Sequence, residues 1–237
     1  VIYFALPACI AMLYLFRPMP DTRSKKPQIL LGRGLHPETP AGLQTGTPLM
    51  GSDGTMAGAL ARTSQTSTLL FNPPVSARNS LKTLSKVAQH SATLPLFYKC
   101  SARQATQLRA LGCCVARIAQ DAILDLESCD LATPSRRSLR RKLRAAKKAS
   151  VSVKPLELTQ GTLETIEDID AEWQASNGTA RGFSMGRYEA GYLRQQAVFG
   201  AWQDDTLVAF ISCHKSADIW VLDLIRARAN LPSGTIH

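Results

Sequence analysis

The chain has 237 residues, of which 45% are hydrophobic and 6% aromatic, and 28 Lys and Arg side chains against 18 Asp and Glu give a net charge of +10. This apolar content excludes a disordered tail, and the absence of a glycine period excludes a collagen-like chain. The length suits one large domain or two small ones, and the positive charge favours an anionic partner such as nucleic acid or a lipid surface.

The N-terminal residues 1–16 are apolar and carry no charge, and four cations follow within ten residues. A membrane-spanning helix needs about 20 such residues, and flanking cations favour the cytoplasmic side. We therefore expect residues 1–26 to be the remnant of a membrane anchor with its basic flank. A signal-peptide core, a lipoprotein-like Leu-Pro-Ala-Cys sequence and a buried helix are the alternatives. Residues 27–68, rich in Gly, Pro, Thr and Ser, are expected to be a linker or a loosely ordered segment.

The next segment alternates between helical and strand patterns. Apolar residues at helical spacing predict a helix over 80–92, a strand is expected at 94–98, and a second helix at 102–111 ends before Gly112. Residues 115–118 and 123–126 are further strand candidates. The pattern predicts an α/β fold.

A strongly basic helix is predicted after Thr133, which has the residue type of an N-cap, and Pro134. Its apolar stripe is narrow, and eight cations without an acid cover the rest. The basic surface of such a helix faces solvent, anionic lipid or RNA, and its charge alone does not indicate which of the three it contacts. The eight cations are Arg136, Arg137, Arg140, Arg141, Lys142, Arg144, Lys147 and Lys148.

An acidic helix is predicted over 162–174, with Leu163, Ile166, Ile169 and Trp173 on its apolar side. Three β-rich segments follow at 197–203, 206–213 and 219–225, and Asp204 and Asp205 form the first turn. These segments predict an antiparallel meander. The fold class is therefore α/β with a mixed sheet whose late strands are antiparallel.

Six cysteines are spread along the chain without the spacing of a metal site. None belongs to a Cys-x-x-Cys pair, and no histidine lies at ligand spacing from any of them. We expect buried or idle thiols in a reducing compartment, with no metal and no cofactor. The six are Cys9, Cys100, Cys113, Cys114, Cys129 and Cys213.

Two motifs carry more specific chemistry than charge does. One is a loop in which two glycines flank an aromatic residue and a methionine, so that a ligand can approach the backbone closely. The other is Asp223 with Arg226 at the end of a strand, either as a surface ion pair or as groups that hold an ammonium and a carbonyl or phosphate. In an ideal strand these two point to opposite faces unless a bend intervenes. The loop consists of Arg181, Gly182, Phe183, Ser184, Met185, Gly186 and Arg187.

The order of these segments resembles the C-terminal domain of bacterial phosphatidylglycerol lysyltransferases, the multiple peptide resistance factors. The resemblance covers residues 69–237, and its most specific pieces are GFSMGR and LDLIR followed by Pro-x-Gly-Thr. The other matching segments are LPLFYKCSARQATQLRALG, AILDLESCDLATPSRRSLRRKLRAAKK, EWQASNGTARGFSMGRY and AWQDDTLVAFIS.

The resemblance implies a tandem of GNAT-type acyltransferase folds, with a first half at about 69–154 and an incomplete second half at about 155–237. It implies transfer of a lysyl or alanyl group from aminoacyl-tRNA to phosphatidylglycerol, on the cytoplasmic side of a bacterial cell membrane. The product lipid carries less negative charge and so weakens the binding of cationic antimicrobial peptides. Asp223 and Arg226 match the Asp-x-x-Arg element of the family, which implies that Asp223 holds the amino group and Arg226 orients the ester or phosphate. The loop from Arg181 to Arg187 is implied to bind substrate.

Two departures from the family pattern stand out. Residues 71–74 read Phe-Asn-Pro-Pro where the family often has Gly-Asp-Pro, and family members continue beyond the Gly-Thr element near the end of this chain. A partial sequence or a non-catalytic homologue explains this. Two other functions therefore stay open: an acyltransferase with another acceptor, and a binding module for anionic lipid or RNA. The amino acid transferred and the oligomeric state are not predicted.

Overall fold

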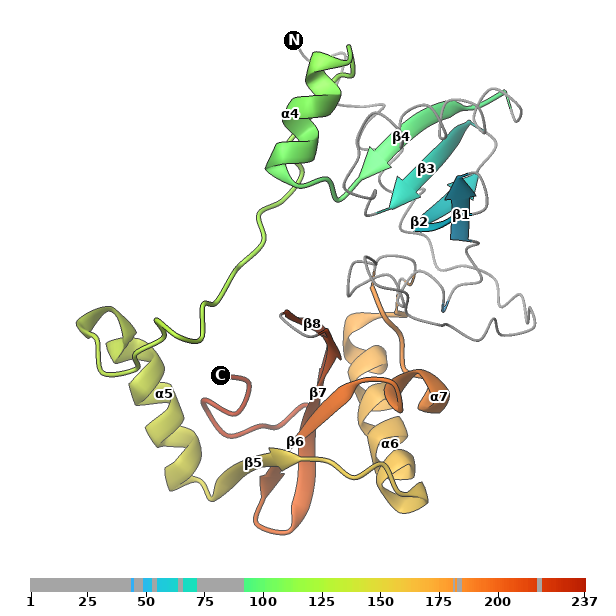
Figure 1. Cartoon of the computed structure of the whole chain (residues 1–237). Helices are drawn as coiled ribbons and strands as arrows, with labels where there is room; N and C mark the ends of the chain where they lie inside the picture. The colour runs from blue at the N-terminus through green and yellow to red at the C-terminus, as the bar shows by residue number, and fades with distance from the viewer. Residues whose placement is uncertain are drawn as a thin grey trace. The chain divides into compact units, whose positions relative to one another are not determined.

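The structure is a computed structural model, and it describes Gln44 and residues 49–52, 55–63, 66–71, 92–180, 182, 185–216 and 219–237. The chain divides into two compact units (Figure 1). Unit 1 comprises the chain up to Ala116 together with Ala180–Arg187, and unit 2 comprises Arg117–Thr179 and Tyr188–His237. Each unit has its own four-stranded sheet.

The sheet of unit 1 is mixed. Its strands lie in the order β1-β2-β3-β4, with β3 and β4 parallel and the other pairs antiparallel. The helix α4, Ala102–Ala110, begins with a capping box between Ser101 and Gln104. It ends at Ala110, and Gly112 follows the C-cap Leu111 with a φ of +88°, which suits a residue without a Cβ. The predicted strand at 94–98 and helix at 102–111 are thus confirmed. The strands are β1 Leu49–Ser52, β2 Thr55–Thr63, β3 Ser67–Phe71 and β4 Leu94–Tyr98.

The predicted strands at 115–118 and 123–126 are wrong. Residues 113–125 have no regular secondary structure. Their apolar side chains lie in solvent, with Ile118 51% and Ile123 91% exposed. A short apolar run forms a strand only where a neighbouring strand accepts its hydrogen bonds, and these two runs pair with no described strand.

Unit 2 contains the antiparallel meander, which confirms the prediction for the late strands. The sheet order is β5-β6-β7-β8, and every neighbouring pair is antiparallel. The fold class is α/β, as predicted, although the strands are divided between two sheets. The strands are β5 Val151–Pro155, β6 Ala197–Gln203, β7 Thr206–Lys215 and β8 Trp220–Ala227.

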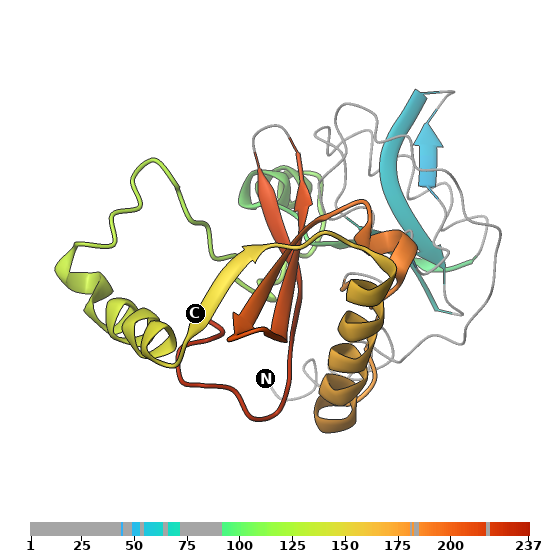
Figure 2. The same cartoon turned by 90° about the horizontal axis from the view of Figure 1, so that it is seen from below.

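Two helices, α6 and α7, pack on one face of this sheet (Figure 2). They span Gln160–Asn177 and Ala190–Leu193. The helix α6 begins where the Thr159 side chain accepts a hydrogen bond from the Thr162 amide. Its apolar stripe of Leu163, Ile166 and Ile169 is buried, as predicted. The core of the unit joins this stripe to Leu193 of α7 and to inward-facing side chains of β6, β7 and β8.

The basic helix α5, Arg137–Lys148, follows a single 3₁₀ turn, η1, over Pro134–Arg136. Proline is the first residue of this turn, as predicted, because its fixed φ suits the first turn of a helix. The Thr133 side chain, however, makes no capping hydrogen bond to the turn. Its hydroxyl donates instead to the Asp130 carbonyl at 3.1 Å.

The strand β8 contains a bulge at Asp223. Ser212 of β7 is paired with Leu224 and the next residue, Cys213, with Leu222, so the pairing skips Asp223. An extra residue in one strand shifts the alternation of side chains by one position. The bulge therefore supplies the bend that Asp223 and Arg226 require to face the same side of the sheet.

Several predicted features lie outside the described residues. They are the N-terminal apolar run over 1–16, part of the predicted linker over 27–68, and the helix over 80–92 except for its last residue. Where the structure describes the predicted linker, the expectation of a loosely ordered segment is wrong, because β1, β2 and the start of β3 lie there and their backbone groups pair in a sheet. Within the described part of the chain, none of the helices has the length and apolar character needed to span a bilayer.

Candidate functional site

The carboxylate of Asp223 lies at the centre of a buried hydrogen-bond network on the helical side of the unit 2 sheet. It accepts hydrogen bonds from the Tyr192 hydroxyl at 2.6 Å and from the Gln196 side-chain amide at 3.0 Å. His214 Nε2 lies 3.4 Å from the same carboxylate oxygen and 3.0 Å from the Tyr192 hydroxyl. Because the single hydroxyl proton of Tyr192 points to Asp223, His214 Nε2 carries a proton, which it shares between the tyrosine oxygen and the Asp223 carboxylate.

This network favours the ionised form of Asp223. Burial of the carboxylate, whose side chain is 5% exposed, raises its pKa, but hydrogen bonds from His214, Tyr192 and Gln196 and the nearby imidazole lower it. The net result is a pKa below the ordinary value of 3.8. The site thus holds a negative charge in an environment that screens charge poorly.

The depressed pKa of Asp223 predicts a stability contribution that depends on pH. A carboxyl whose pKa is lower in the folded protein stabilises the fold fully above its unfolded value of 3.8 and loses that contribution as the pH falls through the folded value. We expect the free energy of unfolding of the wild type to fall more steeply below about pH 4 than that of Asp223→Asn. Urea unfolding between pH 2.5 and pH 7 measures this difference.

The matched control for this titration is Asp205→Asn, because Asp205 lies in an exposed turn between β6 and β7. As the pH falls, the free energy of unfolding of Asp205→Asn is expected to decrease as steeply as that of the wild type. If the free energies of unfolding of the wild type and Asp223→Asn decreased equally steeply below about pH 4, the hydrogen-bonded Asp223 carboxyl would not be ionised as assigned.

Arg226 is also buried, and it joins β8 to α6. Its Nε donates to Asp170 Oδ1 at 2.6 Å, and its Nη1 donates to the Ile225 carbonyl at 3.0 Å. The guanidinium lies over the ring of Trp173, 3.8 Å from the ring centroid. The flat face and two edges of the cation are therefore occupied, and these contacts fix its position.

Tyr192, Gln196, His214 and Asp170 were missed by the motif analysis. Asp170 had a signal in the sequence, because it lies four residues after Ile166 and seven after Leu163, on the apolar stripe of α6. A charge on an apolar stripe indicates a buried partner. His214 had a weaker signal, since it shares the strand face of Phe210 and Ser212.

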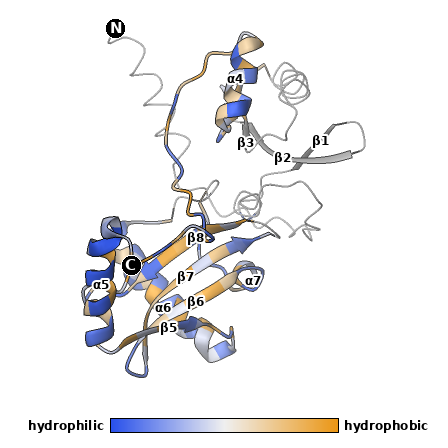
Figure 3. Ribbon diagram, turned by 60° about the vertical axis from the view of Figure 1, so that its left-hand side comes forward, coloured by the Kyte–Doolittle hydropathy of each residue, from blue (hydrophilic) through white to orange (hydrophobic). Residues whose placement is uncertain are grey.

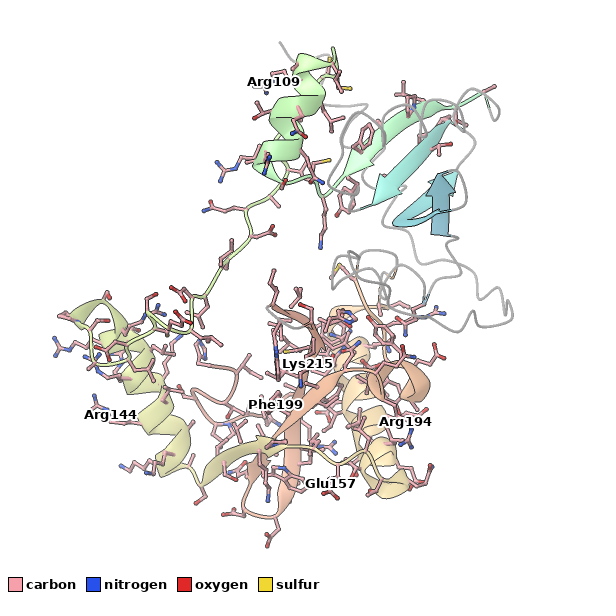
Figure 4. All side chains as sticks on the ribbon, viewed as in Figure 1. Arg109, Arg144, Glu157, Arg194, Phe199 and Lys215 are labelled. Atoms are coloured by element: carbon pink, nitrogen blue, oxygen red, sulfur yellow. The ribbon has the colours of Figure 1, made fainter. Side chains whose placement is uncertain are left out.

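The basic helix α5 divides its cations into two groups. Arg140 donates to the carbonyls of Leu131 and Thr133, and Lys142 Nζ lies 2.6 Å from His237 Nε2, so these two anchor neighbouring segments. Arg136 is partly buried, and five cations are exposed on a helix surface that is largely hydrophilic (Figure 3). Arg144 points away from the sheet (Figure 4). The exposed five are Arg137, Arg141, Arg144, Lys147 and Lys148.

The GFSMGR loop is only partly described, since Arg181, Phe183 and Ser184 lie outside the described residues. Gly182 is buried with a φ of +69°, which explains the glycine at that position. Gly186 is also buried, and the Met185 side chain is 52% exposed. The backbone of Arg187 exchanges two hydrogen bonds with the Gln44 side chain. The described part of the loop belongs to unit 1, whereas Asp223 and Arg226 belong to unit 2.

The Pro-x-Gly-Thr element lies against α5 rather than within the Asp223 network. Gly234 has a φ of +95°, and a Cβ there would lie 2.0 Å from the Lys142 carbonyl oxygen, so only glycine fits. A hollow of about 500 Å³ is lined by Gly234 and Thr235, by Leu143 and Ala146 of α5, and by residues of β5. None of the residues around this hollow belongs to the Asp223 network.

Comparisons with known proteins agree with this fold. The sequence model of one family, described as phosphatidylglycerol lysyltransferase, C-terminal, matches residues 49–237. No curated protein sequence matches the chain.

Two solved structures resemble the chain at low sequence identity. One is the C-terminal domain (DUF2156) assigned to a lysylphosphatidylglycerol synthetase from Agrobacterium fabrum, with a TM-score of 0.76, 19% identity and 84% of this chain covered. The other is L-PGS from Bacillus licheniformis, with a TM-score of 0.66, 16% identity and 75% covered. The chain spans 66% of the first structure and 57% of the second, less than two thirds of either. At these TM-scores the chain shares the fold of the two structures.

Proposed function

Because this chain belongs to the family of phosphatidylglycerol lysyltransferase C-terminal domains, we propose that it transfers an aminoacyl group, lysyl or alanyl, from aminoacyl-tRNA to phosphatidylglycerol. We place it at the cytoplasmic face of a bacterial cell membrane. The aminoacylated lipid carries less negative charge, so the membrane binds cationic antimicrobial peptides less well.

The buried Asp223 carboxylate is the observation that carries this proposal. An aminoacyl ester bears an ammonium group, and an ionised carboxylate in a poorly screened setting is its natural partner. Within the described part of the chain, the Tyr192 hydroxyl, the Gln196 amide and His214 Nε2 hold the carboxylate in one orientation before any substrate arrives, so little reorganisation is needed on binding. Asp223 thus holds the amino group and thereby places the ester carbonyl.

The reaction itself needs no external energy source, because the ester in aminoacyl-tRNA is already activated. The glycerol hydroxyl oxygen of the lipid bonds to the ester carbonyl carbon, and the bond from that carbon to the ribose oxygen breaks. The proton of the lipid hydroxyl passes to the ribose oxygen. We assign Arg226 to orienting the ester or phosphate through Nη2, which donates to no residue in the described part of the chain.

The exposed cations of α5 are proposed to contact the anionic partner. Each cation near an anionic leaflet contributes about 1 kcal/mol, so Arg141→Gln with Arg144→Gln is expected to weaken vesicle binding about 30-fold at low salt. The effect should shrink as salt screens the charges. Sedimentation with phosphatidylglycerol vesicles and filter binding of tRNA measure the two partners separately.

The matched control carries the same loss of charge on a different helix. Arg103 and Arg109 are exposed on α4, so Arg103→Gln with Arg109→Gln removes two cations from unit 1. Equal losses of binding for the two pairs would mean that net charge, and not α5, governs the contact.

The proposed activity is tested by incubating the protein with phosphatidylglycerol vesicles and tRNA charged with labelled lysine or alanine. Label is expected in the lipid extract and is expected to disappear after RNase treatment. Label in another acceptor would favour a different acyltransferase. Vesicle or RNA binding without any transfer would favour a binding module.

A further inference from the structure

The side chain of Gln196 is oriented by the carboxylate beside it. Its Nε2 lies 3.0 Å from Asp223 Oδ2. An ionised carboxylate only accepts hydrogen bonds, so the amino end of the amide must face Asp223 and the carbonyl end must face away. The assignment of nitrogen and oxygen in Gln196 therefore follows from chemistry.

The carbonyl end of Gln196 lacks a donor. Its Oε1 is buried and accepts no hydrogen bond from any residue in the described part of the chain. The great majority of buried polar atoms in proteins have a partner, so an exception next to a charged site calls for an explanation. A ligand that donates a hydrogen bond to Gln196 Oε1 would explain why this oxygen has no partner in the described part of the chain.

The surroundings of this oxygen restrict the chemistry of that ligand. The nitrogen of the same amide is hydrogen-bonded to the Asp223 carboxylate, so a negative charge lies close to Gln196 Oε1. A donor placed there is favoured when it carries positive charge. A primary ammonium has three N–H groups and can serve a carboxylate and a carbonyl together.

We propose that Gln196 is a second substrate-binding residue, whose Oε1 accepts a hydrogen bond from the α-ammonium group of the aminoacyl substrate while its Nε2 holds Asp223. The inference rests on the proposed function and adds to it a selection for α-amino over α-hydroxy acyl groups. The α-ammonium is the group that every aminoacyl ester presents, whatever its side chain.

The two functions of the amide can be separated by substitution. Gln196→Met keeps the size of the side chain but removes both the acceptor and the donor. Gln196→Glu removes the donor to Asp223 and keeps acceptor oxygens. Gln195→Met is the matched control, because Gln195 is the preceding residue, is exposed, and bonds only the Gly191 carbonyl at 3.3 Å.

The probes are two stable analogues of the charged tRNA end, alanyl and lactyl amides of 3′-amino-3′-deoxyadenosine, which differ only in an α-ammonium or an α-hydroxyl group. Calorimetry measures their binding to the full chain. Gln196→Met is expected to lose about 10- to 100-fold affinity for the alanyl probe, the range for a hydrogen bond to a charged group, and little for the lactyl probe. Gln196→Glu and Gln195→Met are expected to keep the preference for the alanyl probe.

Three results would overturn the inference. They are an equal loss of affinity for both probes in Gln196→Met, no loss for either probe in that variant, and a loss of the preference for the alanyl probe in Gln196→Glu, which would mean that only the donor to Asp223 matters. Circular dichroism of each variant reports whether it is folded. If Gln196→Met does not fold, the preference of Gln196→Glu for the alanyl probe tests the inference. Transfer to lipid is measured separately in the wild type, so that a failure of the proposed function is recognised independently of these binding results.

Discussion

Asp223→Asn is expected to lower kcat/KM for aminoacyl transfer at least about 100-fold while the protein stays folded. The substitution preserves the shape of the side chain and removes the charge that faces the substrate ammonium. Loss of one partner of a buried ion pair costs about 3–5 kcal/mol, which corresponds to a factor of this size or larger. The measurement is initial rates of lipid labelling with wild type and variant at matched tRNA concentrations.

The fold of this variant must be checked, because Asp223 also accepts hydrogen bonds from Tyr192 and Gln196. Asparagine retains one acceptor oxygen, so we expect a circular dichroism spectrum close to that of the wild type and a thermal transition that stays cooperative but lies at a lower temperature, because the stabilising charge is lost. Asp223→Ala is expected to lose transfer as well. Turnover at the wild-type rate in a folded Asp223→Asn protein would remove Asp223 from the site.

Asp170→Ala is expected to lower the free energy of unfolding by about 3–5 kcal/mol, because it leaves the Arg226 guanidinium buried without its carboxylate. Both side chains are less than one-tenth exposed, and their 2.6 Å hydrogen bond joins α6 to β8. Replacing both members with apolar residues, as in Asp170→Leu with Arg226→Met, is expected to cost less than the single change. Urea unfolding of the wild type, Asp170→Leu, Arg226→Met and the variant with both changes gives the coupling energy between the two side chains.

A neighbouring ion pair on the same two segments serves as the control. Glu172 and Arg228 lie 3.0 Å apart, but their side chains are about one-third exposed. Glu172→Ala is therefore expected to destabilise the protein far less than Asp170→Ala. Equal effects of the two substitutions would show that burial of the Asp170 pair does not govern its contribution.

Much of the fold follows from periodicity in the sequence. The continuous apolar runs of β6 and β7 specify strands, and the apolar stripe of α6 specifies a helix together with the face that it buries. The same reasoning fails at 115–118 and 123–126, where apolar runs of the right length find no strand to pair with. Strand formation depends on a neighbouring strand that is often distant in sequence, and a local pattern does not report that neighbour.

The candidate site could be predicted only in part. The Asp-x-x-Arg motif indicates Asp223 and Arg226 as site residues. In a regular strand these two side chains would point to opposite faces. The bulge at Asp223 changes that, and it depends on the register between β7 and β8, which no spacing in the sequence reveals. The same register, together with the packing of α7, brings His214 and Tyr192 to the carboxylate. Asp170 alone among the missed residues was available from helical spacing.

The most direct test of the proposed activity is the mass of the lipid formed when the protein is incubated with phosphatidylglycerol vesicles and tRNA charged with alanine or lysine. We predict a new lipid heavier than phosphatidylglycerol by one aminoacyl residue, formed by the wild type and formed at least about 100-fold more slowly by Asp223→Asn. A reaction in which charged tRNA persists and the phosphatidylglycerol mass is unchanged, with a folded wild-type protein, would contradict the account.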